Sequence, residues 1–139
     1  MATCPLPDDA TLDQVNDLFR NDRYANETLR PRIEEASHGH SRVSMDIEPH
    51  HLNAMGSLMG GVPFVLADFS FAIASNIGQA PTVSISSTID HVGVPRTNRL
   101  IATCDLDKDG RSICFATVVV NDDANNPVAR VHFKGFRKH

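Results

Sequence analysis

The chain has 139 residues, of which 41% are hydrophobic and 22% charged, with 8 glycines and 8 prolines. A chain of this length and composition forms one globular domain with its own core, which excludes disordered and collagen-like proteins. The formal net charge of -4, from 13 basic and 17 acidic residues, provides no basic surface for nucleic acid, so we expect no nucleic-acid partner.

Membrane insertion and secretion are also disfavoured. The longest apolar stretch, residues 62–77, is interrupted by Asp68 and two serines and is shorter than the about 20 residues that cross a bilayer. The N-terminus lacks the basic start and apolar stretch of a secretory signal. Three cysteines without Cys-x-x-Cys spacing argue against a disulfide framework and against zinc. We therefore expect a cytoplasmic protein with no membrane segment.

The N-terminal part is expected to hold a flexible arm and one short helix. Residues 1–10 contain two prolines and two aspartates and are expected to form the arm, followed by a single domain over residues 11–139. Thr11 and Gln14 have the spacing of a capping box, and the apolar residues that follow share one helical face. These are Leu12, Val15, Leu18 and Phe19. The pattern predicts a helix that ends near residue 21.

A strand and a long apolar helix are predicted next. Apolar and polar residues alternate over residues 40–48, which is the period of a half-buried strand, and Pro49 ends it. A helix is predicted over residues 62–76, with Pro63 in its first turn. Because apolar residues cover nearly its whole circumference, we expect other elements to wrap it on all sides.

Four further strands are predicted, over residues 83–89, 100–106, 113–120 and 128–136. Turn sequences at Asp109-Gly110 and at residues 125–127 suit antiparallel hairpins. One strand, a buried helix and four strands predict an α+β fold in which a curled antiparallel meander surrounds a central helix. The open edges of such a sheet predict pairing with a second copy, and hence a dimer.

Two features of the central helix suggest chemistry. Asp68 lies among apolar residues, where an acid is costly unless it is hydrogen-bonded, paired or functional. Gly60 and Gly61 precede the helix, whose first N–H groups and positive dipole end favour negative charge. The structural alternatives are that Asp68 faces a water-filled gap and that the two glycines only permit a tight loop.

The sequence resembles a known family at this point. His51, Asn53 and Gly56, followed by Gly60-Gly61 and by Leu66-Ala67-Asp68, are similar to the signature loop and helix of the hotdog-fold acyl-CoA thioesterases, in particular the phenylacetic-acid-degradation type. The resemblance covers roughly residues 33–137 and implies a curled antiparallel sheet around a central helix. It also implies hydrolysis of an acyl-CoA thioester with a small or medium acyl group, which can be aromatic.

The resemblance implies roles for three catalytic positions. Asp68 corresponds to the family's general base or nucleophile, and the backbone amide of Gly60 to the group that polarises the thioester carbonyl. Asn53 corresponds to the amide side chain that orients the carbonyl or the water. The family assembles its sites between two subunits, so we expect a homodimer or homotetramer in which Asp68 of one chain faces the Gly60 loop of another.

Substrate-binding positions are expected around these residues. Gly61 shapes the turn, and the apolar side chains of Met55, Met59 and Phe64 would line an acyl slot. A hydroxyl on the strand after the helix lines the site in the family, and Ser86 and Ser87 are the candidates here. Scattered basic residues could meet the phosphates of coenzyme A, although such residues are usually solvated; they are Arg96, Arg99, Lys108, Arg111, Lys134, Arg137 and Lys138.

One position departs from the family pattern. Many relatives carry histidine immediately before the two glycines, whereas this chain has Met59. This leaves a non-catalytic acyl-CoA binding or sensing protein as an alternative. Acyl-thioester hydration or dehydration is a third hypothesis, which is disfavoured because no histidine lies at a motif position where it could pair with the acid. We expect no cofactor and no metal, because the histidine pairs His38/His40 and His50/His51 have no third ligand at metal spacing.

Overall fold

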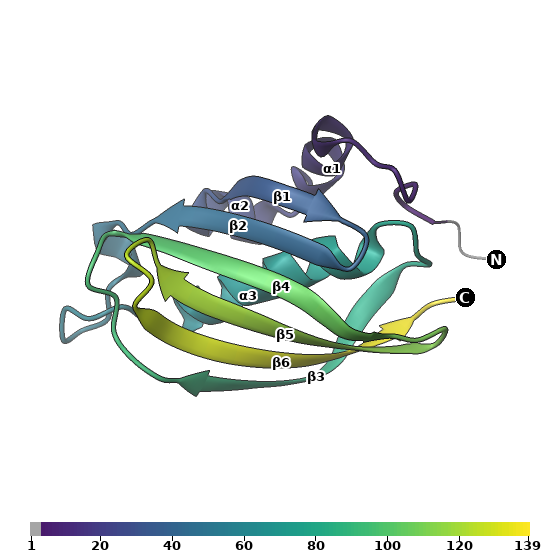
Figure 1. The fold of residues 1–139 in the computed structure, drawn as a ribbon. Coiled ribbons are helices and arrows are strands. Elements are labelled where there is room, and N and C mark those ends of the chain that lie inside the picture. The colour runs from purple at the N-terminus through teal and green to yellow at the C-terminus, as the bar shows by residue number, and fades with distance from the viewer. Residues whose placement is uncertain (1–3) are drawn as a thin grey trace.

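The computed structural model describes residues 4–139. Its elements, in chain order, are α1 (Leu12–Phe19), α2 (Arg23–Leu29), β1 (Arg32–Ser37), β2 (His40–Asp46), the short 3₁₀ helix η1 (Pro49–His51), α3 (Gly61–Asn76), β3 (Thr82–His91), β4 (Arg99–Asp109), β5 (Ile113–Asp122) and β6 (Pro127–Arg137). Figure 1 shows that the strands form one curved layer, with α3 lying across its concave side.

The N-terminal segment packs on the domain. Leu6 is only 5% exposed and pairs with Ile77 in an isolated parallel bridge, while the N–H of Gly78 donates to the Leu6 carbonyl over 2.9 Å. The described part of the expected arm, residues 4–10, therefore does not run free of the domain; residues 1–3 of that expectation lie outside the described residues. Packing of Leu6 beside the end of α3 accounts for the difference, because it removes an apolar side chain from water.

Helix α1 forms as predicted, and α2 was not predicted. The capping box is present: the Gln14 N–H donates to Thr11 Oγ1 over 3.2 Å, and the Thr11 N–H donates to the Gln14 side chain over 2.9 Å. Helix α2 follows after three residues, with Asp22 as its N-cap. It has only seven residues, and its sequence carries no long apolar repeat, so packing against α3 rather than local propensity stabilises it.

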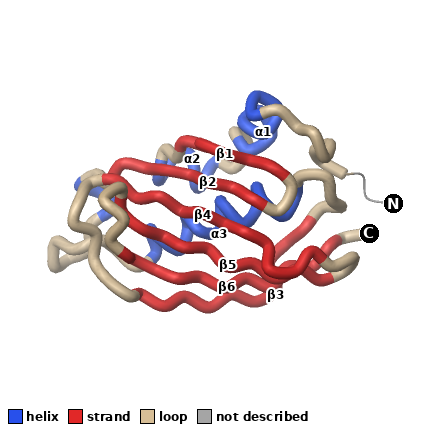
Figure 2. The backbone as a smooth tube through the Cα atoms, viewed as in Figure 1, coloured by secondary structure: helices blue, strands red, loops and turns tan. Residues whose placement is uncertain are grey.

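The sheet has six antiparallel strands in the order β1-β2-β4-β5-β6-β3. The prediction of one strand before the central helix was wrong, because β1 pairs with β2 as a hairpin at the sheet edge. The prediction of a four-strand meander was also wrong: β3 pairs with β6, and β4 pairs with β2. The hairpins β4–β5 and β5–β6 form as expected. The chain therefore crosses over between β3 and β4, as Figure 2 shows.

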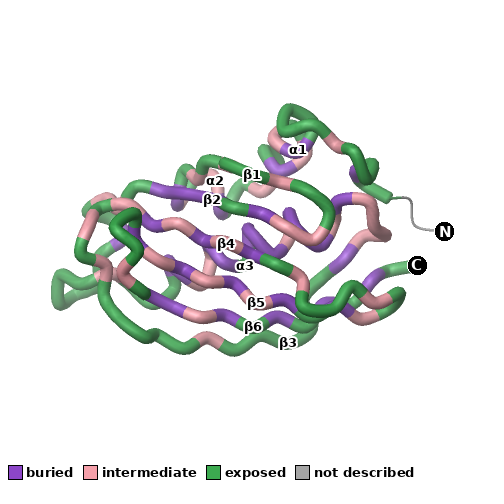
Figure 3. The backbone as a smooth tube through the Cα atoms, in the orientation of Figure 1, coloured by how far each residue is buried: buried purple, intermediate pink, exposed green. Residues whose placement is uncertain are grey.

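The core lies between α3 and the concave face of the sheet. Side chains of β4, β5 and β6 alternate between buried and accessible positions, and Figure 3 shows this alternation along the central strands. Phe71 of α3 stacks on Phe133 of β6 with ring centres 4.7 Å apart. This alternation is what a sheet packed on one face requires, and it confirms the α+β class with a curled sheet around a central helix.

Helix α3 is not covered on all sides, contrary to prediction. The sheet and α2 bury most of its surface, but a stripe at helical spacing remains accessible or half-buried: Gly61, Phe64, Val65, Asp68 and Ala72. The helix thus has more apolar surface than a single chain buries. Strand β3 is similarly open, since most of its residues are exposed, and it appears almost entirely green in Figure 3.

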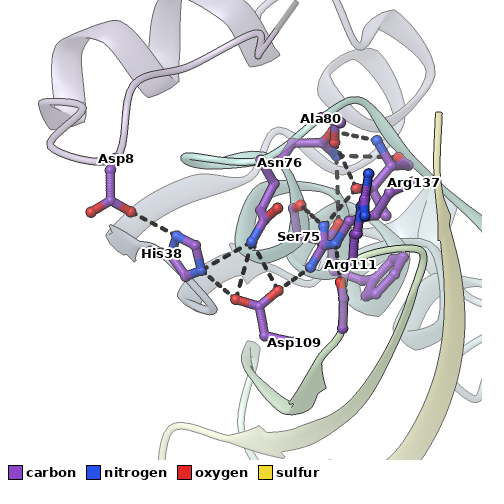
Figure 4. A network of polar contacts seen from close by, with 12 residues as sticks. Asp8, His38, Ser75, Asn76, Ala80, Asp109, Arg111 and Arg137 are labelled. Carbon is purple, nitrogen blue, oxygen red and sulfur yellow. Dashed lines mark hydrogen bonds and ion pairs between the residues drawn. The ribbon is translucent and has the colours of Figure 1, made fainter. Parts of the chain in front are cut away.

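A buried arginine ties the C-terminal strand to the rest of the fold (Figure 4). Arg137 is fully buried and donates to the carbonyl oxygens of Gly110 and Ser75 over 2.9 and 2.8 Å. It also pairs with the carboxylate of Asp109, which His38 contacts as well. Partial burial acts to raise the pKa of Asp109, but its hydrogen bond with His38 and the Arg137 charge hold that pKa below its usual value. Arg137 is therefore a structural residue and not a phosphate ligand.

Among the described residues, no helix combines the length and the apolar character needed to cross a lipid bilayer.

Candidate active site

The signature loop before α3 is organised by Asn53. Its side-chain oxygen accepts hydrogen bonds from the N–H groups of Met55 and Ser57 over 2.9 and 3.1 Å. The Asn53 N–H donates to the Ser57 carbonyl over 2.7 Å, and Gly56 takes a positive φ of 78° to close the turn. The Asn53 oxygen therefore stabilises the loop, while its amide nitrogen donates no hydrogen bond within residues 4–139.

His51 fixes this loop to helix α2. Its Nδ1 accepts from the Glu48 N–H over 2.9 Å, so the neutral ring donates from Nε2 to the carbonyl oxygen of Thr28 over 2.7 Å. His50 contacts the same carbonyl oxygen over 2.9 Å. The expectation that this pair has no third potential ligand nearby was wrong, because Glu48 lies close to both histidines. Both ring nitrogens of His51 are already engaged in hydrogen bonds, however. This histidine pair therefore anchors the loop.

The start of α3 presents two free backbone donors. Gly60 has φ -58° and ψ -28°, and the next bonded amide is that of Val62, which donates to the Met59 carbonyl over 2.9 Å. Within residues 4–139, the N–H groups of Gly60 and Gly61 donate no hydrogen bond. Both glycines are accessible. These N–H groups, at the positive end of the helix dipole, can stabilise an oxygen atom that develops negative charge.

Asp68 lies on the open stripe of α3, and the expectation of a buried acid was wrong for the single chain. The residue is accessible, although it borders a cavity of about 240 Å³ whose wall includes Phe64, Val65 and Tyr24. These neighbours displace part of the water around the carboxylate, and this desolvation, together with the charge of Asp22, raises the pKa of Asp68. A carboxylate with a raised pKa accepts a proton more readily, as a general base requires.

Gly60 and Asp68 are far apart along the helix axis. They are separated by eight residues, which corresponds to about 12 Å at 1.5 Å per residue. A general base and an oxyanion donor that act on the same carbonyl group each lie within roughly 3 Å of the reacting atoms. One chain therefore does not bring these two groups to one carbonyl.

The structure separates the two candidate serines. Ser87 lies opposite Phe133 on the neighbouring strand, and opposite residues of an antiparallel pair share a face. Because Phe133 is buried against α3, Ser87 faces the helix side of the sheet. Ser86 lies opposite Lys134, on the outer face.

The apolar residues expected around the acyl slot are mostly open. Met55 at the loop tip is 88% exposed and Met59 is 53% exposed. Phe64 is half-buried, with its ring centre 6.0 Å from that of Phe133. In a single chain Met55 and Met59 are therefore open to solvent.

Two residues near the candidate site were missed in the sequence. Asp22 lies beside Asp68 because α2 packs on α3, and His91 at the end of β3 lies against Gly60. His91 is 31 residues from Gly60 in sequence, so only the register of β3 against β6 brings them together. No local motif could have identified either contact.

Comparison with known proteins supports the same fold. No family model matches the chain. The E. coli PaaI protein from the phenylacetic acid degradation operon is 24% identical with a TM-score of 0.83, over 91% of this chain and 92% of its own. A Streptococcus pneumoniae protein described as a hypothetical thioesterase, solved with coenzyme A, is 22% identical with a TM-score of 0.81, over 88% of this chain and 96% of its own.

A sequence relative decides the family. An Archaeoglobus fulgidus protein named "Putative esterase" is 30% identical over 120 residues, which are 85% of this chain and 77% of the relative. The chain belongs to the hotdog-fold thioesterases. The fold and the hydrolase class that the resemblance of residues 51–68 implied are therefore confirmed.

Proposed function

We propose that this hotdog thioesterase hydrolyses acyl-CoA thioesters with a small or medium acyl group, aromatic acyl groups included, to the free acid and coenzyme A. The observation that carries the proposal is the pair of free N–H groups at Gly60 and Gly61 on the same helix as the carboxylate of Asp68. The coenzyme A in the Streptococcus pneumoniae relative supports CoA as the carrier.

Asp68 acts as the general base or nucleophile in this proposal. As a base, it removes a proton from a water molecule while the water oxygen bonds to the thioester carbon. The Gly60 N–H stabilises the negative carbonyl oxygen of the tetrahedral intermediate. The carbon–sulfur bond then breaks, and the sulfur leaves with the electron pair and takes the proton held by Asp68, which gives the thiol and restores the carboxylate. Neither step requires a cofactor or a metal.

A second copy of the chain completes the site. Because Asp68 and Gly60 lie about 12 Å apart along one helix, Asp68 of one chain would act with Gly60 of another. The exposed β3 edge supports such an assembly, since it leaves backbone groups and the apolar side chains of Val83 and Ile85 uncovered. We therefore propose a homodimer, or a homotetramer built from such dimers.

Substrate contacts follow from the same placement. Asn53 keeps its amide N–H groups available to orient the carbonyl or the water, while its oxygen holds the loop. Met59, Met55 and Phe64 would line the acyl slot once the second chain covers them. Of the two serines, Ser87 is favoured over Ser86, because Ser87 lies on the helix side of the sheet.

The test is a panel of short, aromatic and long acyl-CoAs assayed with a thiol reagent. We expect turnover with at least one substrate, and Asp68→Asn should reduce kcat by about 100-fold or more while the oligomer stays intact. Asp13→Asn, which removes an exposed helical carboxylate from α1, is the matched control and should remain fully active. Near-native turnover by the Asp68→Asn variant would exclude Asp68 from the mechanism.

The binding-only alternative gives a different result in the same experiment. A non-catalytic sensor would bind coenzyme A and acyl-CoA, measured by calorimetry, without producing thiol from any substrate. The accessible Asp68 carboxylate with its raised pKa favours the enzyme, because a site that only binds an acyl group gains nothing from a basic carboxylate.

A further inference from the structure

His91 lies directly against the start of α3. It is the last residue of β3 and pairs with Ala129 of β6, whose side chain is fully buried, so the His91 ring is on the helix side of the sheet. A Cβ atom added to Gly60 would lie 3.2 Å from Cε1 and 3.3 Å from Nε2 of His91, and farther from Nδ1. The Cε1–Nε2 edge of the imidazole thus faces Gly60.

A side chain at position 60 would be in tight contact with the His91 ring. The backbone angles of Gly60, φ -58° and ψ -28°, are available to any amino acid, so conformation does not require glycine here. The His91 ring is what a side chain at position 60 would meet, whereas a Cβ at Gly61 would meet nothing within 4 Å. The absence of a side chain at Gly60 therefore lets the imidazole lie close to the start of α3.

The His91 ring also differs from the other histidines. The chain has seven histidines, and six have a ring nitrogen within hydrogen-bond distance of a protein group; they are His38, His40, His50, His51, His132 and His139. Within residues 4–139, His91 alone has no such partner, and its side chain is accessible. Its ring N–H is available to a ligand.

We propose that His91 is a second hydrogen-bond donor to the thioester carbonyl oxygen, acting beside the Gly60 N–H of the same chain. This inference rests on the proposed thioesterase function and adds a catalytic residue to its site. The Nε2–H group donates to the oxygen as negative charge develops there, and the proton stays on the imidazole throughout. His91 thus supplies a side-chain donor from the strand, while residue 59 provides only a methionine thioether.

Two variants and two ligands test the assignment. His91→Ala removes the donor, and His91→Gln retains an N–H group of similar reach that does not titrate at neutral pH. Coenzyme A has no acyl carbonyl, whereas a non-hydrolysable ketone analogue of the best substrate, with a methylene in place of the thioester sulfur, retains it. We expect His91→Ala to weaken binding of the ketone analogue, measured by calorimetry, and to leave binding of coenzyme A unchanged.

The kinetic expectation is a loss of about 10- to 100-fold in kcat for His91→Ala, with recovery of most of that loss in His91→Gln. His132→Ala removes an exposed imidazole from the outer face of β6 and should retain wild-type kcat and ketone binding. Circular dichroism and gel filtration would establish that each variant is folded.

Three results would overturn the proposal. The first is wild-type kcat in His91→Ala, and the second is an equal loss of kcat in His91→Ala and His91→Gln. The third is that His91→Ala weakens binding of the ketone analogue and of coenzyme A equally. These outcomes differ from failure of the proposed function, in which the wild-type protein itself would hydrolyse no acyl-CoA. An active wild type, an inactive Asp68→Asn variant and an unaffected His91→Ala variant would leave the thioesterase function standing without His91.

Discussion

Complementation between two inactive variants tests whether the site is shared between chains. Asp68→Ala removes the carboxylate and leaves the Gly60 loop intact. Gly60→Pro removes the amide donor and leaves Asp68 intact, and the φ of -58° at Gly60 matches the angle that proline requires. The proline Cβ would approach the His91 ring to about 3.2 Å, and this accessible ring can shift by the few tenths of an ångström needed.

The expected activity follows from counting sites. In a heterodimer, the unmodified Gly60 of the first variant faces the unmodified Asp68 of the second, so one of the two sites is complete. A purified heterodimer should thus have about half of the wild-type kcat per dimer, and a random equimolar mixture about a quarter. If the two groups acted within one chain, every site would carry one defect, and both preparations would be as inactive as the homodimers.

The assay uses two affinity tags, one on each variant. Sequential purification isolates the heterodimer, and hydrolysis of the best acyl-CoA is compared with both homodimers and with wild type carrying the same pair of tags. A doubly tagged heterodimer no more active than the homodimers would refute the shared site. It would also contradict the 12 Å argument from the helix rise, since one chain would then have to bring both groups to one carbonyl.

The remaining predictions concern the base, the acyl slot and stability. Asp22→Asn should move the acid limb of kcat/KM to lower pH, because removing this negative charge lowers the raised pKa of Asp68, while asparagine still caps α2; an unmoved limb would contradict the coupling. Met59→Ala should change KM and acyl preference across a panel of chain lengths, and an equal fall in kcat for every acyl group would instead place Met59 in the catalytic apparatus. Arg137→Met should lower the free energy of unfolding in urea by about 3 kcal/mol, because the carbonyl oxygens of Ser75 and Gly110 lose their donor and Asp109 loses its charge partner. The exposed Lys138→Met is the control, and a loss equal to that control would show that the Arg137 network adds no stability.

Elements with strong local signals were predictable from sequence. Three of these signals depend on residues that are close together in the sequence. They are the capping box of Thr11 and Gln14, the alternation of apolar and polar residues in β2, and the long apolar run of α3. The turns at Asp109-Gly110 and at residues 125–127 likewise determine their hairpins locally. Because such signals do not depend on the rest of the chain, these elements occur in the structure as predicted.

Elements stabilised by distant contacts were not predictable. Strand β1 reads Arg-Ile-Glu-Glu-Ala-Ser and lacks an apolar face, because it is an edge strand that needs little burial. Sequence adjacency favours pairing of β3 with β4, whereas the sheet places β3 beside β6. That placement also brings His91 into contact with Gly60. The sequence could therefore predict the signature loop and Asp68 as parts of the site, but not His91.

The open surfaces of α3 and β3 have one physical explanation. The central helix has more apolar surface than one sheet covers, so the expectation that it is wrapped on all sides failed for a single chain at Phe64, Val65 and Asp68. Strand β3 likewise presents apolar side chains and unpaired backbone groups at an open edge. A second copy of the chain would cover apolar surface at both places and supply the carboxylate that one helix holds about 12 Å from its own amide donors. Burial and catalysis then depend on the same interface, so a substitution that weakens the β3 edge should lower activity and oligomerisation together.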